Sequence, residues 1–587
     1  MNPPLQRARF FIWRAAPALA AALVVAACGG GPETSAPVPV SSPPLTQPAA
    51  LASPAVGYLA TAGPNVFQAS ISPQSTSGIV ALLSTDVGIA NDPSTPLPSD
   101  PVTVAFGATA SAYATVTAAT ALRLRPSAAR SDTVIELAAD RHPDDAIAPQ
   151  IERLLRGPLR STAAASTRRT LSLGTSIGTV ADLWVDQFPI GETPGTYVPV
   201  PATLEYRTPH AYIWVDNTLS FDSASLAQIG ADFENAYASD TAHFGTPEYT
   251  SAAPGAAEET IPCDTSGNPI PNATPVPVLI PPPNGQHVVF VINETNLGSG
   301  VGGYYSAVNH ITQAAANCIA GQPKSNEASM IYVGYATGNP LSYELNEDMV
   351  RGTAHEFQHL INFVNHGILA AQPQTEDRWI NEGLSMLAQD LAVHRLFPSV
   401  ALDVDDAIAY HVADYFKAPQ NFSLTSFSGI EGNSGTFSYN CTGCYGASYL
   451  FMRYLNDRFG GDKFLQAMES SGEVSTANLQ AVTGEPARAL ISDFGVALVA
   501  SNTGATTDPR FVFTGFDPYG TYGDQFGQSI ALSGVTAFAS QQPATSTTYA
   551  PYLGTFTYIA ANPARGAGIT VTDPSGLLQL APALIQR

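Results

Sequence analysis

The chain has 587 residues, a formal net charge of −23 and a hydrophobic content of 45%, and only 12% of its residues are charged. A chain of this length exceeds what one hydrophobic core can organise, so we expect about two to four domains. The negative charge excludes a general nucleic-acid binder, because such proteins neutralise phosphates with lysine and arginine. It indicates a well-solvated surface instead.

The first 27 residues have the layout of a signal peptide. Three arginines flank an apolar run, residues 15–27, that is too short to span a bilayer as a permanent helix. The run ends in the sequence Val-Ala-Ala-Cys at residues 25–28, which resembles the lipid-attachment site of bacterial lipoproteins. The resemblance implies that Cys28 carries a lipid and contacts the membrane. An ordinary signal peptide cut near Ala27 is the alternative.

Residues 28–55 are expected to be a tether between Cys28 and the folded protein. They are rich in proline, serine, threonine and alanine, and Glu33 is their single charge, so they cannot bury a core. Because Gly29 rather than an aspartate follows the cysteine, the lipoprotein resemblance implies the outer membrane or the cell surface. We therefore expect an exported protein that is lipid-anchored to the cell envelope, or alternatively a secreted one.

The next region, residues 56–205, is expected to be an N-terminal β-rich domain or a prosegment. In its first half, short apolar runs alternate with turn residues, which is typical of strands. Residues 146–156 predict a short helix, and residues 179–188 and 210–217 predict further strands. Removal of a prosegment near Arg168 is the alternative to a permanent domain.

Residues 206–515 are expected to form an α+β domain, and residues 516–587 a small C-terminal β-rich domain. A helix, two buried strands and a second helix are expected in the α+β domain, at residues 225–245, 287–293, 328–335 and 445–459. After residue 516, glycine, serine and threonine alternate with apolar residues. The sequence thus predicts a multidomain protein in which mainly β segments flank a mixed region.

Four cysteines follow Cys28, and an even number in an exported chain favours disulfides. Three pairings are open, of which we favour Cys263–Cys318 together with Cys441–Cys444. A thioredoxin-like redox site at Cys441 and Cys444 is the alternative, but no βαβ pattern accompanies it in the sequence.

The sequence HEFQH at residues 355–359 has the composition of a metal site. Apolar residues recur at helical spacing before and after it, and no proline interrupts them, so we expect it to lie on a helix. His355 and His359 are then one turn apart on the same face and can reach one ion, and Glu356 can act on a water molecule there. From composition alone this pattern is expected roughly 0.014 times in the chain.

Such a site needs a third protein ligand. His366 follows on nearly the same face, but it lies about 10 Å further along a straight helix, so we exclude it. Glu382, in the sequence WINEGLS, lies within an apolar helix whose core face is Leu384, Leu387 and Leu391. A glutamate on the buried side of a helix needs a metal ion or a basic partner, which makes Glu382 the better candidate.

HExxH followed by a helix with a glutamate resembles the gluzincin peptidases. HEFQHLI with NEGLS is most similar to the hyicolysin-type secreted bacterial metallopeptidases, over about Leu345 to Asp390. The resemblance implies a zincin-like α+β catalytic domain with the HExxH helix in its active site. It also implies one Zn²⁺ per chain and hydrolysis by a zinc-activated water. The ligands would be His355, His359 and Glu382, and the general base Glu356.

Two features depart from the gluzincin pattern. The segment of 22 residues between His359 and Glu382 is longer than is usual in the aminopeptidase branch. Met386 stands where thermolysin-like enzymes carry an aspartate that orients a ligand histidine, so another residue must take that role.

The resemblance implies two further parts of an active site. One is a tyrosine or histidine after the third ligand that stabilises the developing oxyanion. We choose Tyr445 for this role, with Tyr439 and His411 as alternatives. The other is an edge strand just before the HExxH helix that aligns an extended peptide, and residues 329–335 fit that place.

The sequence therefore predicts a zinc metalloendopeptidase of the cell envelope that acts on a protein or peptide. A gluzincin aminopeptidase is the close alternative, disfavoured because no GAMEN-like stretch is found to hold a free amino terminus. A surface binding lipoprotein with an inactive metal site would have to explain the intact Glu356. Residues 403–406, Asp-Val-Asp-Asp, are too weak a pattern to support structural calcium, and no residue pattern indicates an oligomeric state.

Overall fold

The computed structural model describes ten longer and ten shorter stretches of the chain. They are residues 56–70, 78–86, 99–107, 150–151, 154–155, 173–187, 196–249, 259–260, 262–264, 266–273, 276–297, 302–337, 348–400, 402–431, 436–438, 441–524, 529–539, 546–561, 568–576 and 578–586. By its internal contacts the chain divides into residues 1–46 and 47–587, and all described residues belong to the second unit. The predicted signal peptide, Cys28 and the tether lie outside the described residues.

A mixed sheet of six strands forms the framework of the middle region, in the order β12-β13-β11-β8-β7-β6. Its strands are β6 (Val180–Gln187), β7 (Thr196–Arg207), β8 (Ala211–Asp216), β11 (His287–Asn293), β12 (Gly303–Tyr305) and β13 (Met330–Tyr335). β8, β11 and β13 run parallel, and the other neighbours pair antiparallel. The parallel strands are continuous apolar runs because both of their faces are covered.

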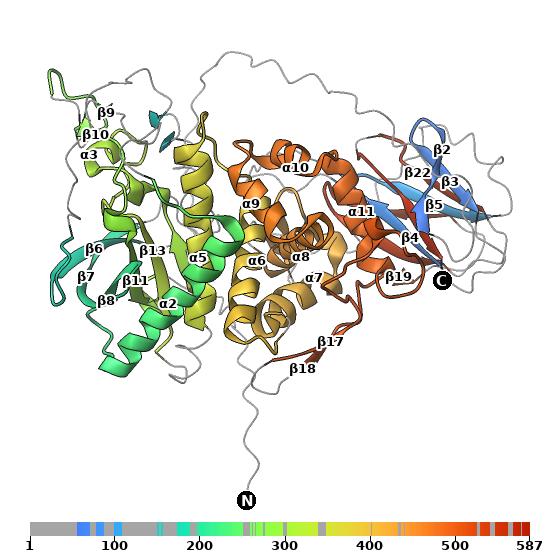
Figure 1. Cartoon of the computed structure of the whole chain (residues 1–587). Helices are drawn as coiled ribbons and strands as arrows, with labels where there is room; N and C mark the ends of the chain where they lie inside the picture. Colours follow the sequence, from blue (N-terminus) through green and yellow to red (C-terminus); the bar gives the residue numbers. More distant parts are fainter. Residues whose placement is uncertain are drawn as a thin grey trace, which may run out of the picture. The chain divides into compact units, whose positions relative to one another are not determined.

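Helices α2 (Ser223–Phe244) and α5 (Met349–Asn362) pack on each other and on one face of this sheet (Figure 1). Successive strand residues point to opposite faces. Val289 and Ile331 accordingly share an apolar cluster with Phe357 of α5, whereas Phe290 and Tyr332 belong to a second cluster that includes β6 and β7. The sheet thus supports α5 through alternate residues of its central strands.

The chain after α5 is mainly helical. Its elements are the π-helix η6 (Phe363–Leu369), α6 (Arg378–Leu396), the π-helix η7 (Val404–Val412), α7 (Ala413–Lys417), α8 (Thr442–Phe459), α9 (Asp462–Ser470), α10 (Ser475–Thr483) and α11 (Ala487–Ala500). Helix α6 packs against both α5 and α8. A Cβ atom on Gly383 of α6 would lie 2.7 Å from the carbonyl oxygen of Ser448, so only glycine allows this approach to α8. Among the described helices, none is long and apolar enough to cross a membrane.

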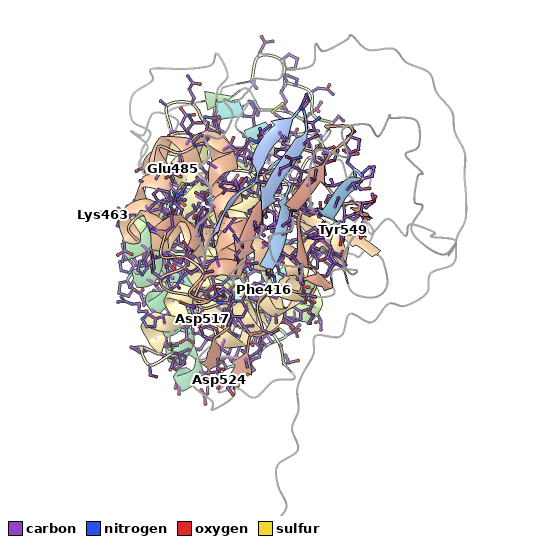
Figure 2. All side chains as sticks on the ribbon, turned by 90° about the vertical axis from the view of Figure 1, so that its right-hand side faces the viewer. Phe416, Lys463, Glu485, Asp517, Asp524 and Tyr549 are labelled. Carbon is purple, nitrogen blue, oxygen red and sulfur yellow. A yellow bond between two sulfur atoms is a disulfide. The ribbon has the colours of Figure 1, made fainter. Side chains whose placement is uncertain are left out.

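Strands from the two ends of the chain form two five-stranded sheets with a shared apolar core. One has the order β1-β23-β4-β21-β19 and the other β2-β3-β22-β5-β20. Their bounds are β1 (Val56–Tyr58), β2 (Ala60–Gly63), β3 (Val66–Ser70), β4 (Gly78–Leu83), β5 (Val102–Gly107), β19 (Phe538–Ala539), β20 (Ser546–Tyr549), β21 (Phe556–Ala561), β22 (Gly568–Thr572) and β23 (Ala583–Gln586). In Figure 2, Tyr549 labels β20 beside the blue N-terminal strands.

This arrangement differs from the expected separate N-terminal and C-terminal β regions. Strands of residues 56–107 and of residues 538–586 alternate within the same sheets, so neither set is a domain alone. In addition, β6 and β7, which we placed in the region 56–205, belong to the central sheet. Pairing between strands is decided by long-range contacts that a local pattern does not encode.

The two five-stranded sheets together form a β-sandwich, and this sandwich packs against helix α11. Tyr58 of β1 donates a hydrogen bond to Asp493 Oδ1 at 2.6 Å, and Tyr558 of β21 donates one to the carbonyl oxygen of Gly495 at 2.7 Å. Phe494 and Phe556 lie with ring centroids 5.9 Å apart. The sheet that contains β4 and β21 is therefore covered on both faces, by the other five-stranded sheet on one and by the helical region on the other.

The four described cysteines form the two disulfides that the sequence favoured. Cys263 pairs with Cys318 and Cys441 with Cys444, with Cα atoms 5.2 Å and 5.1 Å apart. The second disulfide lies at the start of α8. The remaining short elements are β9 (Glu259–Thr260), β10 (Val276–Pro277), α3 (Gln313–Ala316), β14 (Phe422–Ser423), β15 (Ser428–Glu431), β16 (Thr436–Ser438), β17 (Thr521–Gly523) and β18 (Ser529–Ala531).

Candidate metal centre

The structure brings His355, His359 and Glu382 together from two packed helices. The two histidines lie one turn apart on α5, and the glutamate lies on α6. Glu382 Oε2 is 3.3 Å from His355 Nε2 and 3.6 Å from His359 Nε2. One ligand atom from each of the three residues lies within 4.8 Å of the others, and no other group of three such side chains meets this condition in the described residues.

The electrostatics of this group show how strongly the three side chains interact. Burial by itself raises the pKa of Glu382 and lowers that of His359. The attraction between them outweighs burial, so the pKa of Glu382 falls well below its ordinary value and that of His359 rises to about 9. Two imidazoles and one carboxylate are also the donor set of many catalytic zinc sites. The residues present therefore fit a zinc ion.

Glu356 lies beside this group and faces strand β12. Its side chain is buried, and within the described part of the chain its Oε2 atom has no hydrogen-bond partner. Burial raises the pKa of Glu356 above that of an exposed glutamate. A Cβ atom on Gly303 of β12 would lie 3.3 Å from Glu356 Oε1, so the carboxylate is in contact with the strand. Glu356 thus lies between the histidines and the strand, and its Oε2 atom is not engaged in a hydrogen bond with a described residue.

The edge strand of the sheet is β12, so our prediction that residues 329–335 form it was wrong. β13 lies inside the sheet, because β12 pairs antiparallel with it and β11 pairs with its other side. β12 has only three residues, begins with Gly303 and follows Gly302, so its sequence has no strand-like apolar run. Among the described strands β12 pairs with β13 alone, so it lies at the edge of the sheet.

Three polar residues of α6 hold the outer nitrogen atoms of the histidines. His359 Nδ1 is 3.1 Å from Asn381 Oδ1 and 3.0 Å from Ser385 Oγ. His355 Nδ1 is 3.3 Å from Gln389 Oε1. These residues are placed to orient the two histidines. In thermolysin-like enzymes an aspartate at the position of Met386 has this role, and the sequence alone did not indicate which residue replaces it. Their spacing would have indicated them, because Ser385 and Gln389 lie about one and two turns after Glu382 on the same helix face.

The comparisons with known proteins bear on this geometry. Residues 271–552 match the family model described as Peptidase M30. The match supports a zinc metallopeptidase, that is, a hydrolase of peptide bonds. It spans both α5 and α6, and so includes all residues of the candidate centre.

Two further comparisons add less. No curated protein sequence matches this chain. Among solved structures, the chain is similar to the crystal structure of Legionella pneumophila aminopeptidase A in complex with aspartic acid, with 10% sequence identity and a TM-score of 0.27. That similarity covers 66% of this chain and 36% of the aminopeptidase chain, and at this TM-score it carries no argument.

Within the Peptidase M30 match, Tyr445 on α8 lies beside the candidate centre. Its ring centroid is 6.3 Å from that of His355 and 5.2 Å from that of His411. Of the alternatives to Tyr445, His411 is engaged elsewhere: its Nε2 is 3.4 Å from Asp406 Oδ1, and its Nδ1 is 3.1 Å from the carbonyl oxygen of Thr442. Tyr439 lies outside the described residues. The role of Tyr445 stays a prediction.

His366 and Asp403 do not join the centre. His366 is buried in η6, where its Nε2 is 3.8 Å from Glu469 Oε2, and it is not among the three residues of the ligand group. Asp403 accepts hydrogen bonds from Arg351 and Gln389, so its carboxylate is bound by protein donors. Among the described residues, His355, His359 and Glu382 thus remain the one candidate group of metal ligands.

Proposed function

We propose that the protein is a zinc-dependent endopeptidase of the bacterial cell envelope. The observation that carries the proposal is the convergence of His355, His359 and Glu382, with Glu356 placed between them and the edge strand β12. The Peptidase M30 match supports the metallopeptidase part independently. We infer the endopeptidase specificity from strand β12, and the envelope location from the N-terminal sequence.

Zinc held by the three ligands would act as a Lewis acid and lower the pKa of a water molecule. Glu356 is placed to take the proton from that water, because its Oε2 atom has no partner among the described residues. Its raised pKa, caused by burial, makes it a better base than an exposed glutamate. The same carboxyl group then returns the proton to the leaving amine. Tyr445 is our choice for the donor that stabilises the developing oxyanion.

Strand β12 favours an internal peptide bond as the substrate. A peptide that adds to the outer side of β12 is bound through main-chain hydrogen bonds and continues in both directions. Residues 297–306, which include β12, contain no acidic residue that could bind a free amino terminus. An aminopeptidase would need such a group beside the catalytic glutamate, so the strand supports an endopeptidase.

The location is proposed from the N-terminal sequence alone. The apolar run before Cys28 and the tether after it support export and attachment by a lipid, with secretion as the alternative. Cys28→Ala should release the protein from membranes into the soluble fraction. A wild-type protein that is already soluble in the culture medium would contradict the lipid anchor.

Cleavage mapping on a denatured protein substrate tests the proposed activity. We expect internal cleavage products in mass spectra of the wild-type digest, and none after treatment with a chelator. Glu356→Gln should keep the metal and lose hydrolysis by several orders of magnitude, because Gln cannot take up a proton. Unchanged hydrolysis by this variant would exclude the mechanism. Products shortened only from the amino terminus would exclude the endopeptidase in favour of an aminopeptidase.

A further inference from the structure

Gln389 of α6 is the polar residue that contacts His355 on the side away from Glu382. Its side chain is buried, and its Oε1 atom lies 3.3 Å from His355 Nδ1. Its Nε2 atom donates to Asp403 Oδ2 at 2.8 Å and to Asp406 Oδ2 at 2.7 Å. The amide group therefore bridges one histidine and two carboxylates.

The two carboxylates determine which way the amide of Gln389 points. Asp403 also accepts from Arg351 Nε at 3.0 Å and 3.1 Å, and Asp406 Oδ1 lies 3.4 Å from His411 Nε2. An ionised carboxylate only accepts hydrogen bonds, so it must face the NH₂ group of the glutamine. The carbonyl oxygen of Gln389 must then face His355, and an oxygen there requires a proton on Nδ1.

The charge of Asp406 is secured by its neighbours. Burial raises the pKa of Asp406, but the attraction of His411 and Arg351 lowers it by more. The pKa of Asp406 therefore lies below the ordinary value for aspartate. Asp406 is thus ionised near neutral pH and cannot donate to Gln389. The groups facing this carboxylate are Gln389, His411 and Arg351.

We propose that Gln389 is a positioning residue that keeps His355 in the tautomer with Nδ1 protonated and Nε2 free for the metal. The inference rests on the proposed function, since it gives a reason for the bridge only if His355 is a ligand. Gln389 takes the place of the carboxylate that usually orients a ligand histidine. It does so as a neutral amide whose direction is set by Asp403, which is buried, and Asp406, which is partly exposed.

A similar arrangement at His359 supports this assignment. Ser385 Oγ donates to Gln358 Oε1 at 2.6 Å, so it accepts from His359 Nδ1 at 3.0 Å. Gln358 Nε2 in turn donates to Glu469 Oε1 at 2.9 Å. Nδ1 of each histidine thus faces an oxygen atom of α6, which is the amide oxygen of Gln389 at His355 and the hydroxyl group of Ser385 at His359.

Two substitutions of Gln389 separate a positioning role from a merely structural one. Gln389→Met keeps the length of the side chain but removes the acceptor, and we expect zinc affinity to fall about 10- to 100-fold. Gln389→Glu restores an acceptor for His355 and places a third carboxylate beside Asp403 and Asp406. We therefore expect it to regain most of the zinc affinity while the melting temperature of the metal-free protein falls.

The measurements are zinc dissociation constants by chelator competition, and melting temperatures of the metal-free protein. Gln286→Met is the matched control, because Gln286 is also buried but donates to the carbonyl oxygen of Thr208 near β11. It should leave zinc affinity unchanged. Wild-type affinity in Gln389→Met would overturn the proposal, as would equal losses of affinity in the Met and Glu variants. Since no peptide hydrolysis is measured, an inactive wild type would contradict the proposed function and leave this result standing.

Discussion

Asp232 of α2 is a buried acid that plays no part in the candidate centre. Gln228 donates to its Oδ1 at 2.7 Å, and its Oδ2 has no hydrogen-bond partner in the described part of the chain. Burial raises its pKa from 3.8 to about 7. The folded protein therefore binds a proton up to about pH 7 that the unfolded chain releases near pH 3.8. The contribution of protonated Asp232 to the free energy of unfolding is therefore fully present below pH 3.8 and is lost as pH rises through 7.

Asp232→Asn removes this titration while keeping the shape and the contact with Gln228. We expect the melting temperature of the variant, relative to wild type, to increase between pH 5 and pH 7 and to level off above that. Asp222→Asn on the same helix is the control: the pKa of Asp222 is lowered by hydrogen bonds to Ser225, so its difference from wild type should stay constant over this range. A constant difference for Asp232→Asn as well would show that its pKa is not raised.

At the scale of elements, the contact between β12 and α5 places Glu356, our proposed general base, beside the edge strand. A Cβ atom on Gly303 would lie 2.8 Å from the carbonyl oxygen of Tyr332, and 3.3 Å from Glu356 Oε1. Gly303→Ala should therefore shift the strand or the carboxylate of Glu356, our proposed general base, and lower kcat/KM by about 10- to 100-fold, as small misplacements do. The measurement is steady-state hydrolysis of a peptide substrate.

Gly302→Ala is the matched control for this substitution. A Cβ atom on the adjacent Gly302 would have no described atom within 4 Å, so an alanine there meets open space. Its kcat/KM should stay near that of wild type. Equal activity of the two variants would contradict the close contact between β12 and Glu356.

The same elements show what the sequence could predict. The helix with His355 and the helix with Glu382 were predictable, because their apolar residues follow the helical period and the ligands sit at fixed spacing on it. Strand β12 was not, because three residues that begin with a glycine carry no periodic pattern. Gln389 could have been found from its spacing to Glu382, but its anchors, Asp403 and Asp406, come from a separate segment.

At the scale of the whole molecule, the two chain ends depend on each other. β4 lies between β21 and β23, and β22 lies between β3 and β5, so strands from either end have partners from the other. Apolar patterns predicted strands in both segments, but their pairing spans more than 400 residues and no local pattern encodes it. The segment that carries the candidate metal ligands lies between these ends in sequence.

Truncation after Leu553 removes β21, β22 and β23. It exposes the buried residues of β4 and removes the hydrogen bond from Tyr558 to Gly495, so we expect a large loss of soluble yield and a lower melting temperature. The control lacks residues 2–55, which contribute no described strand, and should melt as the wild type does. An unchanged melting temperature of the C-terminal truncation would show that the sandwich does not stabilise the rest.

The claim that a centre of two histidines and Glu382 holds one zinc ion is tested most directly by the zinc content of purified protein. Glu382→Ala removes the ligand from α6, and His366→Gln changes a histidine that lies outside the group. After dialysis, elemental analysis should find one zinc per chain in the wild type and in His366→Gln, and far less in Glu382→Ala. One zinc per chain in Glu382→Ala would contradict the assignment of Glu382, and with it the account of the centre.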